Sequence, residues 1–171
     1  MNAGVELTST IAGYRVIEQL YSGSRTLVYR AIREADAEDG SAKRRRQPVV
    51  IKILRRNYPT FNELLQFCNQ YTIAKNLRQL GVVEPYSLEF YRNSYALVME
   101  DFGGISLKEY VQTYDIELNE FLTVAFQLSE ILNGLYCKRI IHKDIKSANI
   151  LWRSPVKSSK SIAVPFTSIL D

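Results

Sequence analysis

The most informative segment of this chain is Ile140-Ile141-His142-Lys143-Asp144-Ile145-Lys146-Ser147-Ala148-Asn149-Ile150-Leu151. It follows a long stretch whose apolar residues recur at helical spacing, and aliphatic residues flank its polar centre. Between them stand a carboxylate (Asp144), an amine (Lys146) and an amide (Asn149). A short loop that presents these three groups together indicates a site that positions a charged substrate.

This segment resembles the catalytic loop of protein kinases, in which His-Arg-Asp is followed by Asn five residues after the Asp. The resemblance implies that Asp144 accepts the proton of the substrate hydroxyl, Lys146 steadies the γ-phosphate and Asn149 holds a magnesium ion. His142, the only histidine of the chain, packs as a structural residue in that family. Lys143 replaces the arginine, which keeps the positive charge and loses the bidentate geometry.

A lysine motif lies about ninety residues before the catalytic loop. Val49-Val50-Ile51-Lys52 is similar to the third-strand lysine motif of the family, so we expect Lys52 to contact the α- and β-phosphates of ATP. Taken alone, a lysine in an apolar strand is more often an edge residue whose ammonium group reaches water.

A hairpin precedes that lysine and is similar to the glycine-rich loop that covers the phosphates in the family. Of the motif it keeps only the middle glycine, Gly23, and the following valine, Val28, both of which we expect to bind ATP. Tyr21 and Thr26 stand at the other glycine positions. Because glycine gives such a loop its conformational freedom, we expect a stiffer lid.

Residues 97–104 resemble the hinge between the two kinase lobes. The resemblance places Met99 behind the adenine and the backbone groups of Glu100 and Phe102 at its edge, with the glycines Gly103 and Gly104 allowing the chain to turn. A strand that ends in a glycine turn would explain the same residues without a nucleotide.

Two features of the family pattern are altered. The glutamate that normally pairs with the motif lysine is replaced by Gln70 or a residue beside it, and Glu63, two turns earlier, is a poorer substitute. No Asp-Phe-Gly motif is found: residues 161–165 stand near its expected place without an acid, and Asp171 is an alternative, displaced equivalent. Both changes put full catalytic efficiency in doubt.

The residue patterns predict an α+β order of five strands, with one helix after the third strand, followed by further helices. The resemblance implies a bilobal fold of the protein-kinase type, with a complete five-stranded small lobe containing one helix and a truncated helical large lobe. The predicted strands are 14–20, 26–32, 48–54, 86–91 and 94–100, and the predicted helices run from Thr60 to an end at Gly81, over 106–112 and over 118–138. We expect an N-terminal extension at 1–10, a partial kinase domain at 11–152 and a divergent or truncated tail at 153–171.

Composition excludes several classes of protein. The 171 residues are 46% hydrophobic and 23% charged, which is typical of a globular domain, and no apolar run approaches the roughly 18 residues of a membrane helix. The basic run at 43–46 follows an acidic stretch, so we expect a solvated loop at 34–47 and no nucleic-acid partner. Cys68 and Cys137 lack metal-ligand spacing, which favours free core thiols and a cytoplasmic, reducing location.

The resemblance implies ATP- and Mg²⁺-dependent phosphorylation of serine or threonine on a protein substrate in signal transduction. The lack of a long apolar run predicts no insertion into a membrane. Lys146, two residues after Asp144, favours serine/threonine over tyrosine. The sequences of residues 140–146 and 100–104 are similar to those of kinase domains found at the start of large bacterial, especially cyanobacterial, multidomain signalling proteins. Three alternatives stay open: a catalytically dead fragment that binds only nucleotide or protein, a small-molecule kinase of the same fold, and a nucleic-acid binder built on the basic run.

Overall fold

The computed structural model describes residues 11, 13–35, 45–153 and 161–165. The chain divides into two compact units. The first unit comprises Met1–Pro59 and Leu88–Asp101, and the second comprises Thr60–Ser87 and Phe102–Asp171. The predicted extension at 1–10 lies outside the described residues.

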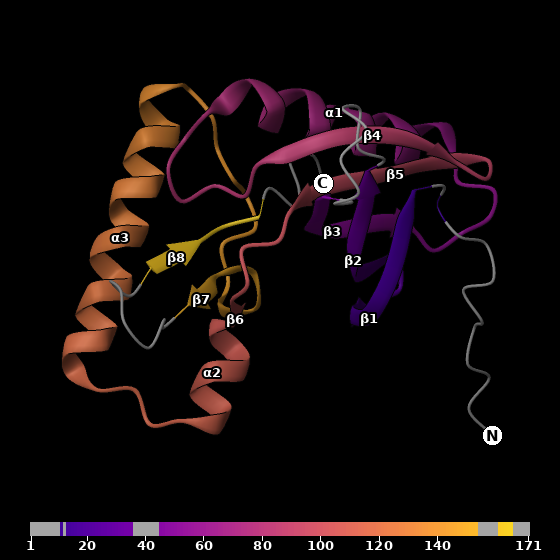
Figure 1. The fold of residues 1–171 in the computed structure, drawn as a ribbon. Helices are drawn as coiled ribbons and strands as arrows, with labels where there is room; N and C mark the ends of the chain where they lie inside the picture. The colour runs from indigo at the N-terminus through magenta and orange to yellow at the C-terminus, as the bar shows by residue number, and fades with distance from the viewer. Residues whose placement is uncertain (1–10, 12, 36–44, 154–160, 166–171) are drawn as a thin grey trace. The chain divides into compact units, whose positions relative to one another are not determined.

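The first unit is built on a five-stranded sheet (Figure 1). Its strands are β1 (Tyr14–Ser22), β2 (Thr26–Ala35), β3 (Arg45–Leu54), β4 (Pro85–Tyr91) and β5 (Ser94–Glu100), and their order across the sheet is β1-β2-β3-β5-β4. β1 with β2, β2 with β3 and β3 with β5 are antiparallel pairs. The five strands predicted from the sequence are thereby confirmed.

Alternation of side chains gives this sheet two different faces. One face carries a row of β-branched and small residues at the centre of the strands, and these are almost fully buried: Ala31, Val49, Ile51, Ala96 and Val98. β1 lies at the edge of the sheet, and its residues Ile17 and Leu20 are exposed.

The predicted loop at 34–47 is shorter than expected. Residues 36–44 lie outside the described residues, but β2 continues to Ala35 and β3 begins at Arg45. Glu34 lies opposite Arg46 in the ladder and also forms an ion pair with Arg15 at 3.6 Å. The second half of the basic run therefore belongs to a strand, since pairing between oppositely charged cross-strand residues supports the sheet there.

Helix α1 (Phe61–Leu77) begins where the sequence predicts. The side chain of Thr60 accepts a hydrogen bond from the backbone of Glu63, and the Glu63 carboxylate accepts one from the backbone of Thr60, which together form a capping box. The predicted end was wrong: Arg78, not Gly81, adopts the left-handed conformation that ends the helix. The carbonyl groups of Leu77 and Arg78 accept hydrogen bonds from the side chain of Lys138.

The second unit packs α1, α2 (Leu107–Thr113) and α3 (Leu118–Cys137) with a small antiparallel sheet. That sheet contains β6 (Ile105–Ser106), β7 (Leu151–Arg153) and β8 (Ser161–Ala163), in the order β6-β7-β8. A 3₁₀ turn, η1 (Ser147–Asn149), precedes β7. The core of the unit joins buried residues from α1, from α3, and from β7 and β8 with the residues beside them: Ala74, Leu77, Val124, Ile131, Leu135, Ile150, Trp152, Ile162 and Val164.

Gly81 is required by packing and by backbone conformation. Its φ is +78°, and a Cβ atom placed on it would lie 2.4 Å from the side chain of Ile131 on α3. Its carbonyl oxygen accepts a hydrogen bond from the backbone of Val164. The glycine thus allows the segment after α1 to run directly against α3 and the chain after β8.

Part of the expected tail is a structural element. β8 pairs with β7, with Leu151 opposite Ala163 and Trp152 opposite Ile162, and Val164 is fully buried. The sequence pattern did not predict this strand because three residues are too few to show a period. Residues 154–160 and 166–171 lie outside the described residues.

Both faces of α3 are apolar, but only one is covered. Val124, Ile131 and Leu135 are buried, whereas Phe121 and Phe126 are more than half exposed.

Of the helices in the described ranges, none has the length and apolar composition needed to cross a membrane. Both cysteines are free thiols, but Cys137 is exposed at the end of α3, so its prediction as a core residue was wrong.

Candidate active site

The C-terminal end of α3 leads into the catalytic-loop segment. Arg139 has a φ of +58°, its backbone amide donates to Tyr136 at 2.8 Å, and the amide of Ile140 donates to Leu135 at 3.0 Å. These two hydrogen bonds form a Schellman motif, here with arginine in the place that glycine usually takes. The motif ends the helix and turns the loop back along the unit.

His142 holds the loop to the segment that follows β8. Its side chain is 3% exposed, and Nε2 lies 2.9 Å from the carbonyl oxygen of Pro165. Because a carbonyl can only accept, Nε2 carries the proton of this bond. The role that the family resemblance gives to this histidine, a structural one, agrees with its burial.

The residue between His142 and Asp144 has an unusual backbone conformation. Lys143 has a φ of +62°, and the amide of Asp144 donates to the carbonyl of His142 at 2.9 Å. This three-residue turn is costly for a residue that has a Cβ atom, and such conformations persist where the surrounding structure imposes them. The turn separates the buried His142 from the partly exposed carboxylate of Asp144.

The structure brings together Asp144, Lys146 and Asn149. Nζ of Lys146 lies 2.9 Å from Oδ1 of Asp144, and Nδ2 of Asn149 donates to Oδ2 at 2.6 Å and to the backbone oxygen of Asp144 at 3.0 Å. The 3₁₀ turn fixes this arrangement, since the amide of Asn149 donates to the carbonyl of Lys146 at 2.8 Å. Each carboxylate oxygen therefore has its own donor.

These contacts determine the charge state of the carboxylate. Partial burial of Asp144 favours the neutral form, but the hydrogen bonds from Lys146 and Asn149 and the positive charge of Lys146 outweigh it, so the pKa of Asp144 lies below its ordinary value. Asp144 is thus ionised at neutral pH and oriented by its neighbours.

The oxygen atoms of this loop can supply a small part of a magnesium site. Nδ2 of Asn149 donates to Asp144, and the amide oxygen is the one side-chain atom of Asn149 whose chemistry suits a cation. Magnesium commonly takes one or two protein ligands and completes its shell with phosphate oxygens and water, so the donor set fits one such ion. Over the described ranges no cluster of three or more acidic, histidine or cysteine side chains could hold a metal, and residues 161–165, near the predicted place of an Asp-Phe-Gly motif, contain no acid.

In the first unit, three of the residues predicted to bind ATP share one face of the sheet. Val28 lies opposite Lys52, which lies opposite Leu97, and Met99 is two residues further along β5. Cross-strand partners and residues two apart project from the same face. Lys52 is 7% exposed.

The hairpin loop with the fourth predicted residue, Gly23, is hydrogen-bonded to Arg55, the residue that follows β3. The amide of Gly23 donates to Thr26 at 2.9 Å, while the guanidinium group of Arg55 donates to the hydroxyl of Ser22 at 3.1 Å and to the carbonyl of Gly23 at 3.0 Å. A Cβ atom on Gly23 would lie 2.6 Å from the ring of Tyr21. The stiffer lid predicted from the missing glycines stays a prediction, and Arg55 adds a restraint that the sequence did not indicate.

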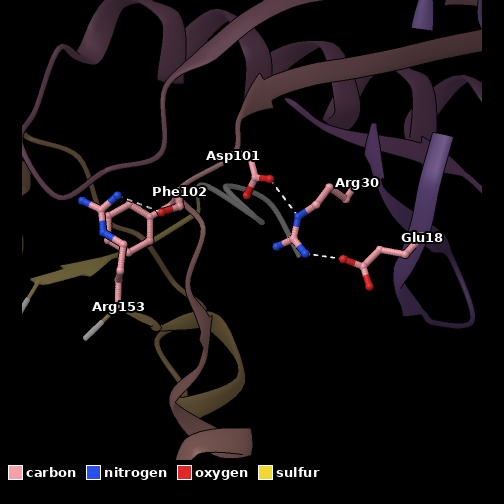
Figure 2. A network of polar contacts seen from close by, with 5 residues as sticks. All are labelled: Glu18, Arg30, Asp101, Phe102 and Arg153. Carbon is pink, nitrogen blue, oxygen red and sulfur yellow. Dashed lines mark hydrogen bonds and ion pairs between the residues drawn. The ribbon is translucent and has the colours of Figure 1, made fainter. Parts of the chain in front are cut away.

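The predicted hinge leaves β5 after Glu100, where the chain passes from the first unit to the second. Within the first unit, Nε of Arg30 donates to Oδ2 of Asp101 at 2.7 Å, and the same guanidinium group pairs with Glu18 (Figure 2). Within the second unit, Arg153 donates to the carbonyl oxygen of Phe102 at 3.1 Å and its guanidinium group lies 4.5 Å from the centre of the Phe102 ring.

Sequence reasoning missed two arginines, Arg30 and Arg153, that contact residues of the predicted hinge. A signal for Arg30 was available, because it is two residues from Val28 in the same strand and so projects from the face that carries Val28 and Lys52. No signal was available for Arg153, whose partner is fixed by the pairing of β6 with β7. Gln70 lies in α1 of the second unit and Lys52 in the first, so their pairing stays a prediction.

Comparison with known proteins assigns the family. A family model described as protein tyrosine and serine/threonine kinase matches residues 14–163. Serine/threonine-protein kinase PrkC of Bacillus subtilis is 33% identical over 105 residues, which cover 60% of this chain and 16% of that protein. A probable serine/threonine-protein kinase of Clostridium acetobutylicum is 26% identical over 140 residues, covering 81% of this chain and 20% of that protein.

A fungal relative is also a serine/threonine-protein kinase by name. Serine/threonine-protein kinase CLA4 of Candida albicans is 28% identical over 148 residues, which cover 81% of this chain and 14% of that protein. The chain thus spans between 14% and 20% of the length of these three curated relatives. The match to the family model reaches Ala163 and includes β8. The chain belongs to the protein tyrosine and serine/threonine kinase family.

Proposed function

We propose that the chain carries the nucleotide-binding and catalytic-loop parts of a kinase that transfers the γ-phosphate of ATP to serine or threonine on a protein. The observation that carries this proposal is the arrangement of Asp144, whose two carboxylate oxygens lie within hydrogen-bond distance of Lys146 and Asn149. Phosphoryl transfer depends on positioning and on charge neutralisation, and this loop supplies both.

Each group of the loop has a role in the proposed reaction. Asp144 orients the substrate hydroxyl and takes its proton as the bond from the hydroxyl oxygen to the γ-phosphorus forms and the bond from that phosphorus to the β-phosphate oxygen breaks. Lys146 neutralises charge on the transferred phosphoryl group. Asn149 would hold Mg²⁺, which when bound neutralises phosphate charge.

The first unit would bind the rest of the nucleotide. Lys52 would contact the α- and β-phosphates, and Gly23 and Val28 would cover them. Met99 would lie behind the adenine, whose edge would meet the backbone groups of Glu100 and Phe102. The common face of Val28, Lys52 and Met99 supports this part of the proposal.

Two features support serine or threonine as the acceptor and the cytoplasm as the location. Lys146 stands two residues after Asp144, as in serine/threonine kinases, and the relatives above carry that name. The two free cysteines agree with a reducing compartment.

A second candidate is a catalytically inactive module that binds nucleotide or a protein partner. It is favoured by the lack of an acid in residues 161–165, near the predicted place of the family's magnesium-binding aspartate, and by an amide, Gln70, at or beside the predicted place of the pairing glutamate. Under this alternative the loop would hold a nucleotide without moving phosphate.

Phosphate transfer from γ-labelled ATP to a generic basic protein separates the two candidates. The chain would be compared with Asp144→Asn, which keeps the shape of the side chain and removes its charge. Incorporation that disappears in the variant would support the kinase. Incorporation equal in both chains would reject catalysis by Asp144, and a rise in melting temperature with ATP would then favour the binding module.

A further inference from the structure

An ion pair crosses the face of the first-unit sheet that carries the predicted nucleotide-binding residues. Arg30 lies opposite Val50 in the β2–β3 ladder, and Val50 lies opposite Met99 in the β3–β5 ladder. Arg30 thus extends over β3 to reach Asp101, two residues beyond Met99, with Nε and Oδ2 2.7 Å apart (Figure 2).

This ion pair is more enclosed than another in the same sheet. The side chain of Asp101 is 9% exposed and that of Arg30 is 28% exposed, and Glu18 holds the guanidinium group from β1. The pair of Arg15 with Glu34 is longer, at 3.6 Å, and its side chains are 57% and 37% exposed. Enclosed, charge-assisted hydrogen bonds hold their partners more firmly than exposed ion pairs do.

The ion pair holds the backbone of Asp101, which lies just beyond the end of the β3–β5 ladder. Glu100 is the last residue paired with β3, opposite Val49, and Asp101 is the first residue beyond the ladder. Past the end of the ladder, the side chain of Asp101 anchors the backbone to β2. The peptide between Glu100 and Asp101 is therefore held by Arg30.

We infer that Arg30, through Asp101, is a positioning residue for recognition of the nucleotide base. The inference rests on the proposed function, which places the adenine edge against the backbone of Glu100 and Phe102. Arg30 does not contact the phosphates in this scheme: it presets the backbone groups that hydrogen-bond to the base, and so lowers the ordering cost of binding.

Calorimetric titration with ATP and with inorganic tripolyphosphate tests the inference. The chains are the wild type, Arg30→Met, Asp101→Asn and the double variant, with Arg15→Met as a matched control that removes the exposed ion pair. Each single variant should weaken ATP binding about fivefold to tenfold, the double variant should lose no more than the more affected single variant, and tripolyphosphate binding should not change. Arg15→Met should bind ATP like the wild type.

Three results would overturn the inference: unchanged ATP affinity in Arg30→Met, equal losses for ATP and tripolyphosphate, or additive losses in the double variant. If Arg30→Met does not fold, Arg30→Lys replaces it, and its loss should be smaller and still confined to ATP. If the wild type binds ATP but transfers no phosphate, the proposed catalysis is rejected, and the titration still decides whether Arg30 positions the base-binding backbone. A wild type that binds no ATP rejects both.

Discussion

Asn149 holds Asp144 at two points: its amide nitrogen donates to the carboxylate at 2.6 Å and to the backbone oxygen at 3.0 Å. With Lys146 on the other carboxylate oxygen, the charged group is fixed before any substrate arrives. Such preorganisation is what a site needs when catalysis depends on positioning.

Removal of the Asn149 amide should raise the pKa of Asp144 toward its ordinary value. In Asn149→Ala one of the hydrogen bonds that favours the carboxylate is lost, while Lys146 remains. A carboxyl group whose pKa is lowered by folding adds stability above its unfolded pKa, and this contribution is lost as the pH falls through the folded pKa. Loss of stability on acidification should thus be smaller in the variant.

Carbon-detected NMR of the Asp144 carboxyl group measures this change directly, and urea unfolding at several acidic pH values measures the linked stability. Ser147→Ala, an exposed change in the same loop, is the control and should leave the titration unaltered. An unchanged Asp144 titration in Asn149→Ala would contradict the role assigned to the amide.

An acid placed at residue 164 should destabilise the second unit. Val164 is fully buried in the core that contains Trp152. Val164→Asp would bury a carboxylate without an arranged partner, which costs about 3 kcal/mol or more. The fluorescence of Trp152, the only tryptophan, reports unfolding of this unit. Val111→Asp, on an exposed site of α2, should change stability by less than about 0.5 kcal/mol.

Two glycines with similar backbone angles should respond differently to alanine. Gly81 has a φ of +78° and faces Ile131, whereas Gly103 has a φ of +71° and open space, with nothing within 4 Å, where a Cβ atom would lie. Gly103→Ala should cost about 1 kcal/mol for the backbone alone. Gly81→Ala should cost about 3 kcal/mol, since overpacking adds to that strain. Equal losses in urea unfolding would show that contact with Ile131 does not matter.

Arg55 should restrain the hairpin loop. In Arg55→Ala the loop loses the hydrogen bonds to Ser22 and Gly23, so amide hydrogen exchange at Ser22–Ser24 should rise about fivefold. Arg15→Ala, which alters β1 away from the loop, should leave the exchange at these amides unchanged. Equal exchange in Arg55→Ala and the wild type would show that the hairpin alone sets the loop conformation.

Local sequence signals determined most of the elements. Short runs of apolar, β-branched and aromatic residues placed the five strands of the sheet, and Thr60 with Glu63 marked the start of α1, because these signals act over a few neighbouring residues. The loop at 140–151 indicated both the family and the residues that the structure brings together at Asp144.

Only the tertiary structure decided the features that depend on distant partners. Arg78 could end α1 without glycine because the following segment packs against α3 and Lys138 binds the last carbonyl groups. Three residues became β8 because the backbone of β7 was there to pair with them. Arg30 and Arg153 reach Asp101 and Phe102, which lie 71 and 51 positions away in the chain, and no pattern within a short window carries such contacts.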